Sequence, residues 1–245
     1  LDSGEEIRAR CVVSGVDPRR SFLELVGERE LPAEFVAAIR RYRFRGCSGK
    51  VNLALAELPR FPCLRAEQEL LRGAISISPS VDYLERAYDE AKYGAFSRRP
   101  YLDIVIPSLL DPSMAPPGKH VMSIFAQYAP YDLAGGWNEA RREAFGDAVI
   151  ETLAEYAPNL KSAILYRQVV TPADLERTLG LTEGSIFHGE IAPAQLFFLR
   201  PAPGWAAYRT PLAGYWLCGS GTHPGGGVMG ASGRNAARAI LRAGA

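Results

Sequence analysis

The last thirty residues constrain the fold of this chain more than any other segment. Tyr215–Cys218 is an apolar run typical of a buried strand, residues 219–230 are dense in glycine, and Ala231–Arg242 has the composition of a helix. Seven of the 24 glycines lie between Gly219 and Gly233. A glycine-rich turn between a strand and a helix offers free backbone N–H groups and the positive end of the helix dipole. The segment predicts a site for an electron-rich group; a tight turn with close helix packing is the alternative.

Several motifs that define common classes of enzyme are missing from the sequence. It contains no G-x-x-x-x-G-K-[ST], which excludes a nucleoside triphosphate P-loop, and no G-x-G-x-x-G that opens a helix after an early strand. The segment Gly219-Ser-Gly221 lacks the G-x-S-x-G spacing of a hydrolase nucleophile, so we interpret Ser220 as a loop hydroxyl. None of the three histidines has a second histidine at metal-ligand spacing, and we expect no metal site.

Composition indicates ordinary globular material. At 245 residues and 47% hydrophobic content, the chain can form one large domain or two modest ones. The formal charge of +1 gives no field that would attract nucleic acid, and no apolar run is long enough to span a membrane. The first residues lack signal-peptide and transit-peptide character. The four cysteines form no C-x-x-C pair. We expect a reducing compartment, the cytoplasm or alternatively the mitochondrial matrix.

Hydrophobic periodicity and capping residues predict alternating strands and helices. The predicted strands cover residues 7–13, 51–55, 101–107, 121–128, 163–170 and 215–218. The predicted helices begin at Pro32, at Ser78 as a cap before Pro79, at Asn138 as the cap of a helix to Tyr156, at Thr171 in a capping-box pattern closed by Gly180, and near Ala231. Three prolines between residues 111 and 118 predict a loop.

His188 is the most informative polar residue outside the glycine segment. An alternating strand through residues 184–190 would place His188 and Glu190 on one side. His188 is then either a satisfied structural histidine or a group that lines a ligand cavity, and the sequence leaves both interpretations open. His223 lies inside the glycine segment before Pro224, and its role is equally open. Arg234, on the last helix, is interpreted as facing solvent.

Four segments, taken together, carry a resemblance to a known family. They are Cys218-Gly-Ser-Gly-Thr-His-Pro-Gly-Gly-Gly-Val-Met-Gly-Ala-Ser-Gly-Arg-Asn-Ala237, Val12-Val-Ser-Gly-Val-Asp-Pro18, Ile186-Phe-His-Gly-Glu190 with Gln195, and Arg200-Pro201. In this order they resemble the phytoene-desaturase-like FAD-dependent oxidoreductases. The resemblance covers essentially the whole chain and corresponds to the C-terminal part of such proteins. The family's N-terminal G-x-G-x-x-G, which binds the ADP half of FAD, is not in this sequence.

The resemblance implies an α/β fold with an α+β substrate domain. We expect a mixed or antiparallel sheet with flanking helices, together with the C-terminal remnant of a Rossmann-like FAD-binding domain. Residues 1–20 and 205–245 would belong to the FAD-binding domain, and residues 21–204 would form the substrate domain. Because an FAD-binding domain cut in this way exposes apolar strand edges, the resemblance also leads us to expect self-association of the chain.

The resemblance also implies the chemistry, in which FAD accepts a hydride from an unidentified apolar or amine-like substrate. It assigns Gly227, Val228 and Met229 to the pyrimidine edge and ribityl chain of the flavin. Gly219 and Ser220 would lie at the phosphate-ribityl side, and His188 and Gln195 would line the substrate side. We expect the 245-residue chain alone to be inactive and to bind FAD weakly or not at all. The alternative is a non-catalytic binding or regulatory protein on the same fold.

Overall fold

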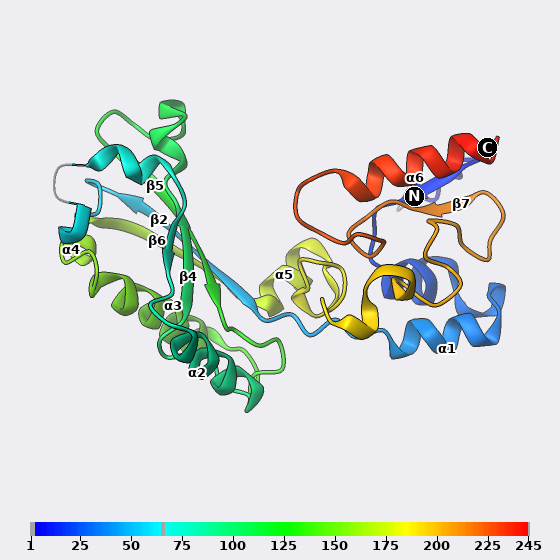
Figure 1. Ribbon diagram of the computed structural model, residues 1–245, viewed down its shortest axis with the longest axis horizontal. Coiled ribbons are helices and arrows are strands. Elements are labelled where there is room, and N and C mark those ends of the chain that lie inside the picture. Colours follow the sequence, from blue (N-terminus) through cyan, green and yellow to red (C-terminus); the bar gives the residue numbers. More distant parts are fainter. Residues whose placement is uncertain (1–2, 65–66, 245) are drawn as a thin grey trace. The chain divides into compact units, whose positions relative to one another are not determined.

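A computed structural model describes residues 3–64 and 67–244 of the chain. The chain divides into two compact units, each described here by itself. The sheet unit is the continuous segment Gly46–Gly184, and the bipartite unit combines Leu1–Arg45 with Ser185–Ala245. Figure 1 shows the sheet unit in light blue to yellow-green and the bipartite unit in darker blue together with yellow to red.

The sheet unit is built on a five-stranded antiparallel sheet with the strand order β3-β4-β5-β2-β6. Its strands are β2 (Ser48–Leu55), β3 (Ile75–Ile77), β4 (Tyr101–Val105), β5 (His120–Gln127) and β6 (Ile164–Val170). Along most of the central strands β2 and β5, buried residues alternate with more exposed ones. In β2, Val51, Leu53 and Leu55 are buried while Lys50 is exposed. One face of the sheet therefore carries the core, as the period of two in the sequence predicts.

Helix α3 (Glu139–Ala154) covers the buried face of this sheet. Phe145, Val149 and Leu153, spaced at three to four residues, are fully buried in one apolar cluster with the inward side chains of β2, β4 and β5. The unit also contains α2 (Val81–Lys92), α4 (Leu160–Ala163) and α5 (Pro172–Leu179). Two glycines allow close contact between helix and sheet, because a Cβ atom on Gly49 would overlap Phe145 and one on Gly146 would overlap Val169.

Helix N-termini in the sheet unit follow local capping chemistry. Asn138 accepts a hydrogen bond from Arg141 N at the start of α3, and Thr171 forms the predicted capping box with Asp174 at the start of α5. The prediction for α2 was wrong by two residues. Ser80, not Ser78, has the extended backbone of a cap, and its hydroxyl accepts from Tyr83 N at 3.1 Å, so Pro79 precedes the helix.

The bipartite unit has a two-stranded parallel sheet, in which β1 (Val12–Ser14) pairs with β7 (Tyr215–Leu217). The predicted strand over residues 7–13 was wrong in its extent. Only the three residues opposite β7 form a ladder, and residues 5–10 have no strand partner among the described residues. Ile7 is 73% exposed, so the alternation of apolar residues in that segment buries no face.

Helices α1 (Ala33–Arg41) and α6 (Ala231–Arg242) complete the bipartite unit, with a π-helical segment at Arg20–Val26. Its core contains Phe22, Phe35 and Ile39, which pack with Ala202 and Leu217. The rings of Phe22 and Phe35 meet edge to face with centroids 4.8 Å apart. Residues distant in sequence therefore share one core in this unit.

The expected fold class is confirmed: the chain is α/β, with an antiparallel sheet and flanking helices in one unit and a strand–loop–helix segment in the other. The units divide at residues 45/46 and 184/185, whereas the sequence prediction divided the chain near residues 20 and 205. Residues 21–45 pack with the bipartite unit because Phe22, Phe35 and Ile39 form its core with Leu217.

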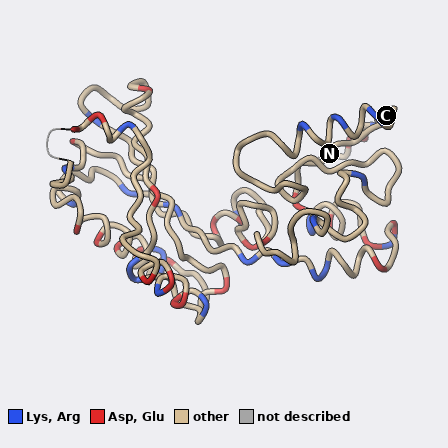
Figure 2. The backbone as a smooth tube through the Cα atoms, in the orientation of Figure 1, with Lys and Arg blue, Asp and Glu red and all other residues tan. Residues whose placement is uncertain are grey.

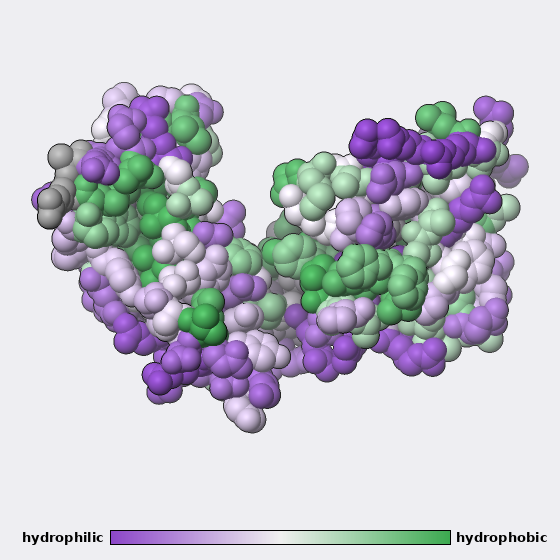
Figure 3. Space-filling model, in the orientation of Figure 1, coloured by the Kyte–Doolittle hydropathy of each residue, from purple (hydrophilic) through white to green (hydrophobic). Residues whose placement is uncertain are grey.

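Basic and acidic residues occur along the backbone of both units (Figure 2). Figure 3 shows that hydrophobic residues also reach the surface of each unit. Among the described residues, no helix is both long and apolar enough to cross a membrane. The described cysteines, Cys11, Cys47, Cys63 and Cys218, are all free thiols.

Candidate functional site

The glycine loop, defined here as Gly219–Gly230, leads from β7 to α6 in the bipartite unit. Its first turn lies against the chain that follows β1. Cys218 N donates to Ser14 O at 2.8 Å. A Cβ atom on Gly219 would overlap the carbonyl oxygen of Gly15, and one on Gly221 would lie 2.6 Å from Pro18 Cδ. These two glycines are therefore required by close packing between the two segments.

The first turn leaves donors unused. Thr222 closes it, with its backbone N–H at 3.0 Å and its hydroxyl at 2.8 Å from the carbonyl oxygen of Gly219. Within residues 3–64 and 67–244, the N–H groups of Gly219, Ser220 and Gly221 donate to no acceptor. Backbone donors without protein partners are available to water or to a ligand.

The second half of the loop is exposed and adopts an uncommon backbone conformation. Gly225, Gly227 and Gly230 have positive φ, and so does Val228, at +56°. A β-branched residue rarely adopts this region, and such strain concentrates at ligand sites. Helix α6 then begins without a side-chain cap, because its N-cap residue is Gly230. The first N–H groups of α6 thus lack the side-chain acceptor that a serine or aspartate would supply.

Arg200 lies behind the first turn and is completely buried. Its Nε and Nη2 donate to the Ser220 carbonyl oxygen at 3.0 and 2.8 Å. Its Nη2 also donates to Phe187 O at 2.6 Å, and longer bonds reach the carbonyl oxygens of Gly189, Glu190 and Gln195. Burial lowers the pKa of the guanidinium, opposed by the Tyr42 hydroxyl. The guanidinium therefore joins the glycine loop to residues 187–195.

Tyr42, His188 and Asp17 lie in the same polar region as Arg200. Tyr42 is 3% exposed and its hydroxyl has no hydrogen-bond partner; burial raises its pKa to about 12, Arg200 opposes this, and Asp17 adds to it. His188 Nδ1 is also buried without a partner, and burial lowers the pKa of its imidazole despite the opposing charge of Asp17. Tyr42 is therefore protonated and His188 is neutral at pH 7.

The structure corrects the local conformation predicted around His188. Residues 184–190 form turns, not an alternating strand, since His188 has φ +54° and Gly189 φ +132°. The Tyr42 ring occupies the space where a Gly189 Cβ would lie, so glycine is required there. His188 and Glu190 are consequently not paired on one strand face. Glu190 instead lies 3.0 Å from Arg43 Nε in an ion pair.

Gln195 is buried, and its amide is already engaged by the backbone. Its Oε1 accepts from Arg43 N at 2.7 Å, while Nε2 donates to Arg43 O at 2.9 Å and to Glu190 O at 3.3 Å. In this arrangement Gln195 connects two distant segments of the bipartite unit. Its predicted place beside a substrate, like that of His188, stays a prediction.

The structure brings Gly219 and Ser220 together with His188 and Gln195, since all four lie on segments that Arg200 joins. Gly227, Val228 and Met229 are exposed on the outer half of the loop. Sequence reasoning missed Arg200 and Tyr42 as members of the site. Arg200 belongs to one of the segments that carry the resemblance, whereas Tyr42 belongs to none, and the signal that would have found both is a contact across many residues.

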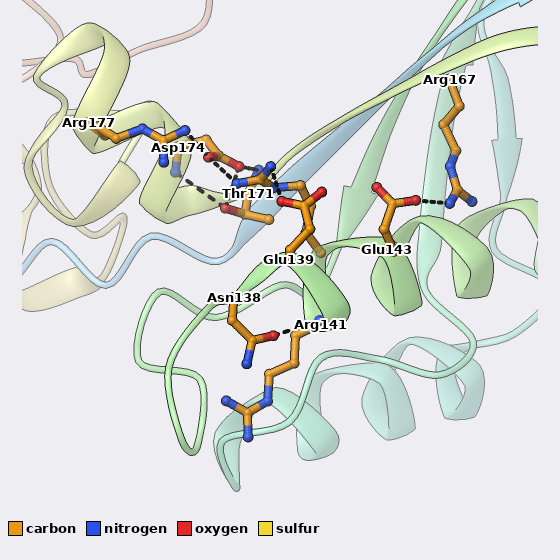
Figure 4. A network of polar contacts seen from close by, with 9 residues as sticks. Asn138, Glu139, Arg141, Glu143, Arg167, Thr171, Asp174 and Arg177 are labelled. Carbon is orange, nitrogen blue, oxygen red and sulfur yellow. Dashed lines mark hydrogen bonds and ion pairs between the residues drawn. The ribbon is translucent and has the colours of Figure 1, made fainter.

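A second polar cluster, in the sheet unit, has a structural explanation. Figure 4 shows it around the N-termini of α3 and α5. Asp174 accepts from Arg142 at 3.0 Å and from Arg177 at 2.6 Å, while its other oxygen caps α5 through Thr171. Every atom of the carboxylate is engaged, so this cluster stabilises the attachment of α5 to α3 and offers no open acceptor.

Comparison with known proteins places these features in context. No family model matches the chain. Over 250 residues, or 99% of the chain, it is 44% identical to pyridine nucleotide-disulfide oxidoreductase domain-containing protein 2 of Rattus norvegicus. This chain is a homologue of that protein. The aligned region is 43% of the rat protein, so the chain spans less than half the length of this relative.

Two further matches agree with this relationship. The lycopene-forming phytoene desaturase of Pseudescherichia vulneris is 34% identical over 130 residues, which is 51% of the chain and 25% of that enzyme. The crystal structure of an oxidoreductase from Methanosarcina mazei matches the fold with a TM-score of 0.56 at 18% identity, covering 96% of the chain and 43% of the solved structure. The resemblance to phytoene-desaturase-like oxidoreductases is thus confirmed, and the fold is that of a known oxidoreductase.

Proposed function

We propose that this chain forms part of the flavin site of an FAD-dependent oxidoreductase. The observation that carries the proposal is the set of unused N–H groups at Gly219, Ser220 and Gly221, followed by the uncapped start of α6 at Gly230. Such donors suit an electron-rich ring edge or a phosphate. The names of the relatives support a redox function in general.

The residues of the glycine loop fit such a cofactor chemically. Gly219 and Ser220 would hold the phosphate-ribityl side, and Gly227, Val228 and Met229 would hold the pyrimidine edge and ribityl chain. When bound, FAD supplies the capacity to accept a hydride from a substrate. The protein's part is then to position the cofactor and to stabilise negative charge, for which a helix N-terminus contributes about 1 kcal/mol.

The polar residues beneath the loop would supply hydrogen bonds at fixed protonation. Because Tyr42 is protonated and His188 is neutral at pH 7, neither residue brings a charge of its own to the site. Both retain a buried atom without a partner, Tyr42 Oη and His188 Nδ1, which is the kind of group that a ligand or an ordered water satisfies.

Exposed apolar side chains around the loop support a substrate with an apolar part. The ring of Phe187 is close enough that a Cβ on Gly226 would lie 2.7 Å from it, and Ile191 would lie 3.6 Å from a Cβ on Gly225. The exposed apolar side chains of the same unit include Ile186, Phe187, Ile191, Phe197, Phe198, Val228 and Met229. Exposed apolar side chains beside a polar site indicate an interaction surface, and those next to the loop would shield the flavin ring from water.

A matched pair of charge substitutions tests the cofactor site. Met229 and Met114 are both exposed, at 61% and 49%, in the bipartite and sheet units respectively. In the full-length protein that contains this sequence, Met229→Asp should weaken FAD binding at least about tenfold, because a carboxylate repels the electron-rich group that the loop would hold. Met114→Asp should leave it unchanged. Fluorescence titration with FAD measures both, and wild-type affinity in Met229→Asp would overturn the assignment.

The same full-length protein distinguishes an FAD-dependent enzyme from a non-catalytic protein that binds FAD. Under anaerobic conditions, bleaching of bound oxidised flavin by a substrate from a panel of apolar and amine compounds would demonstrate oxidation of that substrate. A protein that holds FAD and is reduced by none of them would instead support the non-catalytic alternative.

A further inference from the structure

Arg200 is a buried cation that forms no ion pair within the described residues. Its side chain is fully buried, and no carboxylate of the described residues lies within ion-pair distance of it. Its partners are the carbonyl oxygens of Phe187, Gly189, Glu190, Gln195 and Ser220. Removing a charge from water is costly, and carbonyl dipoles compensate for this in part. An apolar side chain of similar length would fill the space without the cost, so the guanidinium needs another explanation.

The geometry at Ser220 supplies one. Two N–H groups of Arg200 converge on the Ser220 carbonyl oxygen, at 3.0 Å from Nε and 2.8 Å from Nη2. A trans peptide group is planar, and its C=O and N–H point in opposite directions. The bond to Arg200 therefore directs the N–H of Gly221 away from the guanidinium. That N–H is one of the unused donors of the first turn.

The charge acts on the same peptide. A hydrogen bond from a cation to a carbonyl oxygen polarises the peptide group, and the N–H at its other end becomes a stronger donor. The cation also favours negative charge on any ligand held by the turn. Arg200 contacts the loop through backbone atoms, and so acts on a ligand through the peptide and not by direct contact.

We propose that Arg200 is a positioning residue, which fixes the Ser220–Gly221 peptide in the orientation that presents the Gly221 N–H to an anionic or electron-rich group of the cofactor. The inference rests on the proposed function for the identity of the ligand. The orientation of the Ser220–Gly221 peptide does not depend on which ligand binds. The role of Arg200 and the proposed function can therefore be refuted separately.

The test compares Arg200→Lys and Arg200→Met in the full-length protein. Lysine keeps the charge but cannot place two fixed N–H groups on one oxygen, and methionine removes both properties. Ile39→Ala is the control for stability, because Ile39 is buried in the core of the same unit and is not among the residues that contact Arg200. FAD affinity, the midpoint potential of the bound flavin, and hydrogen–deuterium exchange over residues 218–225 are measured in all four proteins.

We expect FAD affinity to fall at least about tenfold in Arg200→Met and less in Arg200→Lys, with faster exchange at Thr222 in both. The flavin potential should fall in Arg200→Met and be restored in part by lysine, since loss of a nearby positive charge disfavours the reduced anion. Ile39→Ala should lose stability without these changes. Wild-type affinity and potential in folded Arg200→Met, or equal effects in Ile39→Ala, would overturn the proposal.

Two outcomes would need a further measurement: a wild-type protein that binds no FAD, and Arg200 variants that do not fold. If the wild-type protein binds no FAD, the proposed function fails, and the exchange data alone decide whether Arg200 orders the turn. If both variants fail to fold, NMR on the wild-type protein decides: the Arg200 Nε–H signal should exchange slowly with solvent and shift when FAD is added. A signal that exchanges at solvent rates, or that FAD leaves unmoved, would overturn the proposal.

Discussion

Two glycines in helices test whether the space beside each helix is filled by protein atoms of this chain or left open. Gly146 lies in α3, and Gly233 lies in the first turn of α6. A Cβ atom on Gly146 would lie 2.5 Å from Val169 Cγ2, whereas one on Gly233 would meet nothing within 4 Å. The same substitution, glycine to alanine, should therefore change stability in opposite directions at the two sites.

The magnitudes follow from geometry and helix propensity. At Gly146, a carbon pair at 2.5 Å is about 1 Å closer than the normal contact distance. Overpacking of this kind costs about 1–3 kcal/mol, and the gain in helix propensity of about 1 kcal/mol offsets part of it. We expect Gly146→Ala to destabilise by about 1 kcal/mol. Gly233→Ala has the gain without the overlap and should stabilise by about 0.5–1 kcal/mol.

Thermal unfolding of the cofactor-free protein measures both changes. A shift of 1 kcal/mol corresponds to about 2–4 °C in Tm for a chain of this size. Gly146→Ala should melt lower and Gly233→Ala higher than the wild type. FAD titration then adds the functional comparison: if the cofactor packs on the first turn of α6, Gly233→Ala should bind FAD more weakly although its cofactor-free form is more stable. Gly146→Ala should bind FAD normally below its melting temperature.

Two results would refute this reasoning. A lower Tm for Gly233→Ala without cofactor would mean that the first turn of α6 packs against protein in a way the structure does not contain. A higher Tm for Gly146→Ala would mean that the contact between α3 and β6 relaxes at little cost.

Four other outcomes are expected. Tyr42→Phe should leave the unfolding free energy unchanged or raise it by up to about 1 kcal/mol because the hydroxyl has no partner, whereas Tyr83→Phe, which loses a 2.9 Å bond to Pro100 O, should lower it by about 1 kcal/mol in urea unfolding. Gly184→Ala should destabilise by more than 2 kcal/mol, since Gly184 has φ +63° and a Cβ there would overlap Pro172; circular dichroism during urea unfolding shows the loss. Burial alone would raise the pKa of Asp174, but hydrogen bonds from Thr171 and the charges of Arg142 and Arg177 outweigh it and lower the pKa. The stabilisation is therefore present above the unfolded pKa of an aspartate and is lost as the pH falls through the lower folded value. In Asp174→Asn, the unfolding free energy should consequently depend less on pH in the acid range than it does in the wild type. Light scattering should detect self-association of the 245-residue chain, because Val12 and Val13 on a two-stranded sheet are each 48% exposed; a monodisperse monomer would contradict it.

Elements set by local chemistry were predictable from the sequence. The starts of α3 and α5 depend on a side chain and a backbone N–H three residues away, at Asn138 and Thr171, and both were identified. The start of α2 was misplaced since two serines flank Pro79, and the choice between them depends on the backbone of Ser80. The strand predicted over residues 7–13 failed for another reason, because β7 pairs with only two of its residues, Val12 and Val13.

In the candidate site too, some residues were predictable from local sequence and others were not. Glycine density revealed the loop, because the need for positive φ and close approach is a property of the residue type. Arg200 was noted only as part of the family resemblance, and its residue type gave no sign that it is buried. An isolated arginine in a sequence indicates a solvent-exposed side chain, and its burial follows from carbonyl groups as far away as Ser220. The Tyr42 ring against Gly189 is likewise a contact across about 150 residues, which no local pattern encodes.

Glycine is required for different reasons at different positions in the glycine loop and the first turn of α6, and composition alone cannot separate these reasons. Gly219, Gly221 and Gly226 are explained within the protein, because a Cβ on each would overlap Gly15, Pro18 or Phe187. Gly230 and Gly233 meet nothing within 4 Å of such an atom. Substitutions in the first group therefore disturb packing within the protein and would weaken the binding of any ligand only indirectly. Gly233 has an ordinary helical φ as well as open space, so a loss of FAD affinity in Gly233→Ala would report on the ligand itself.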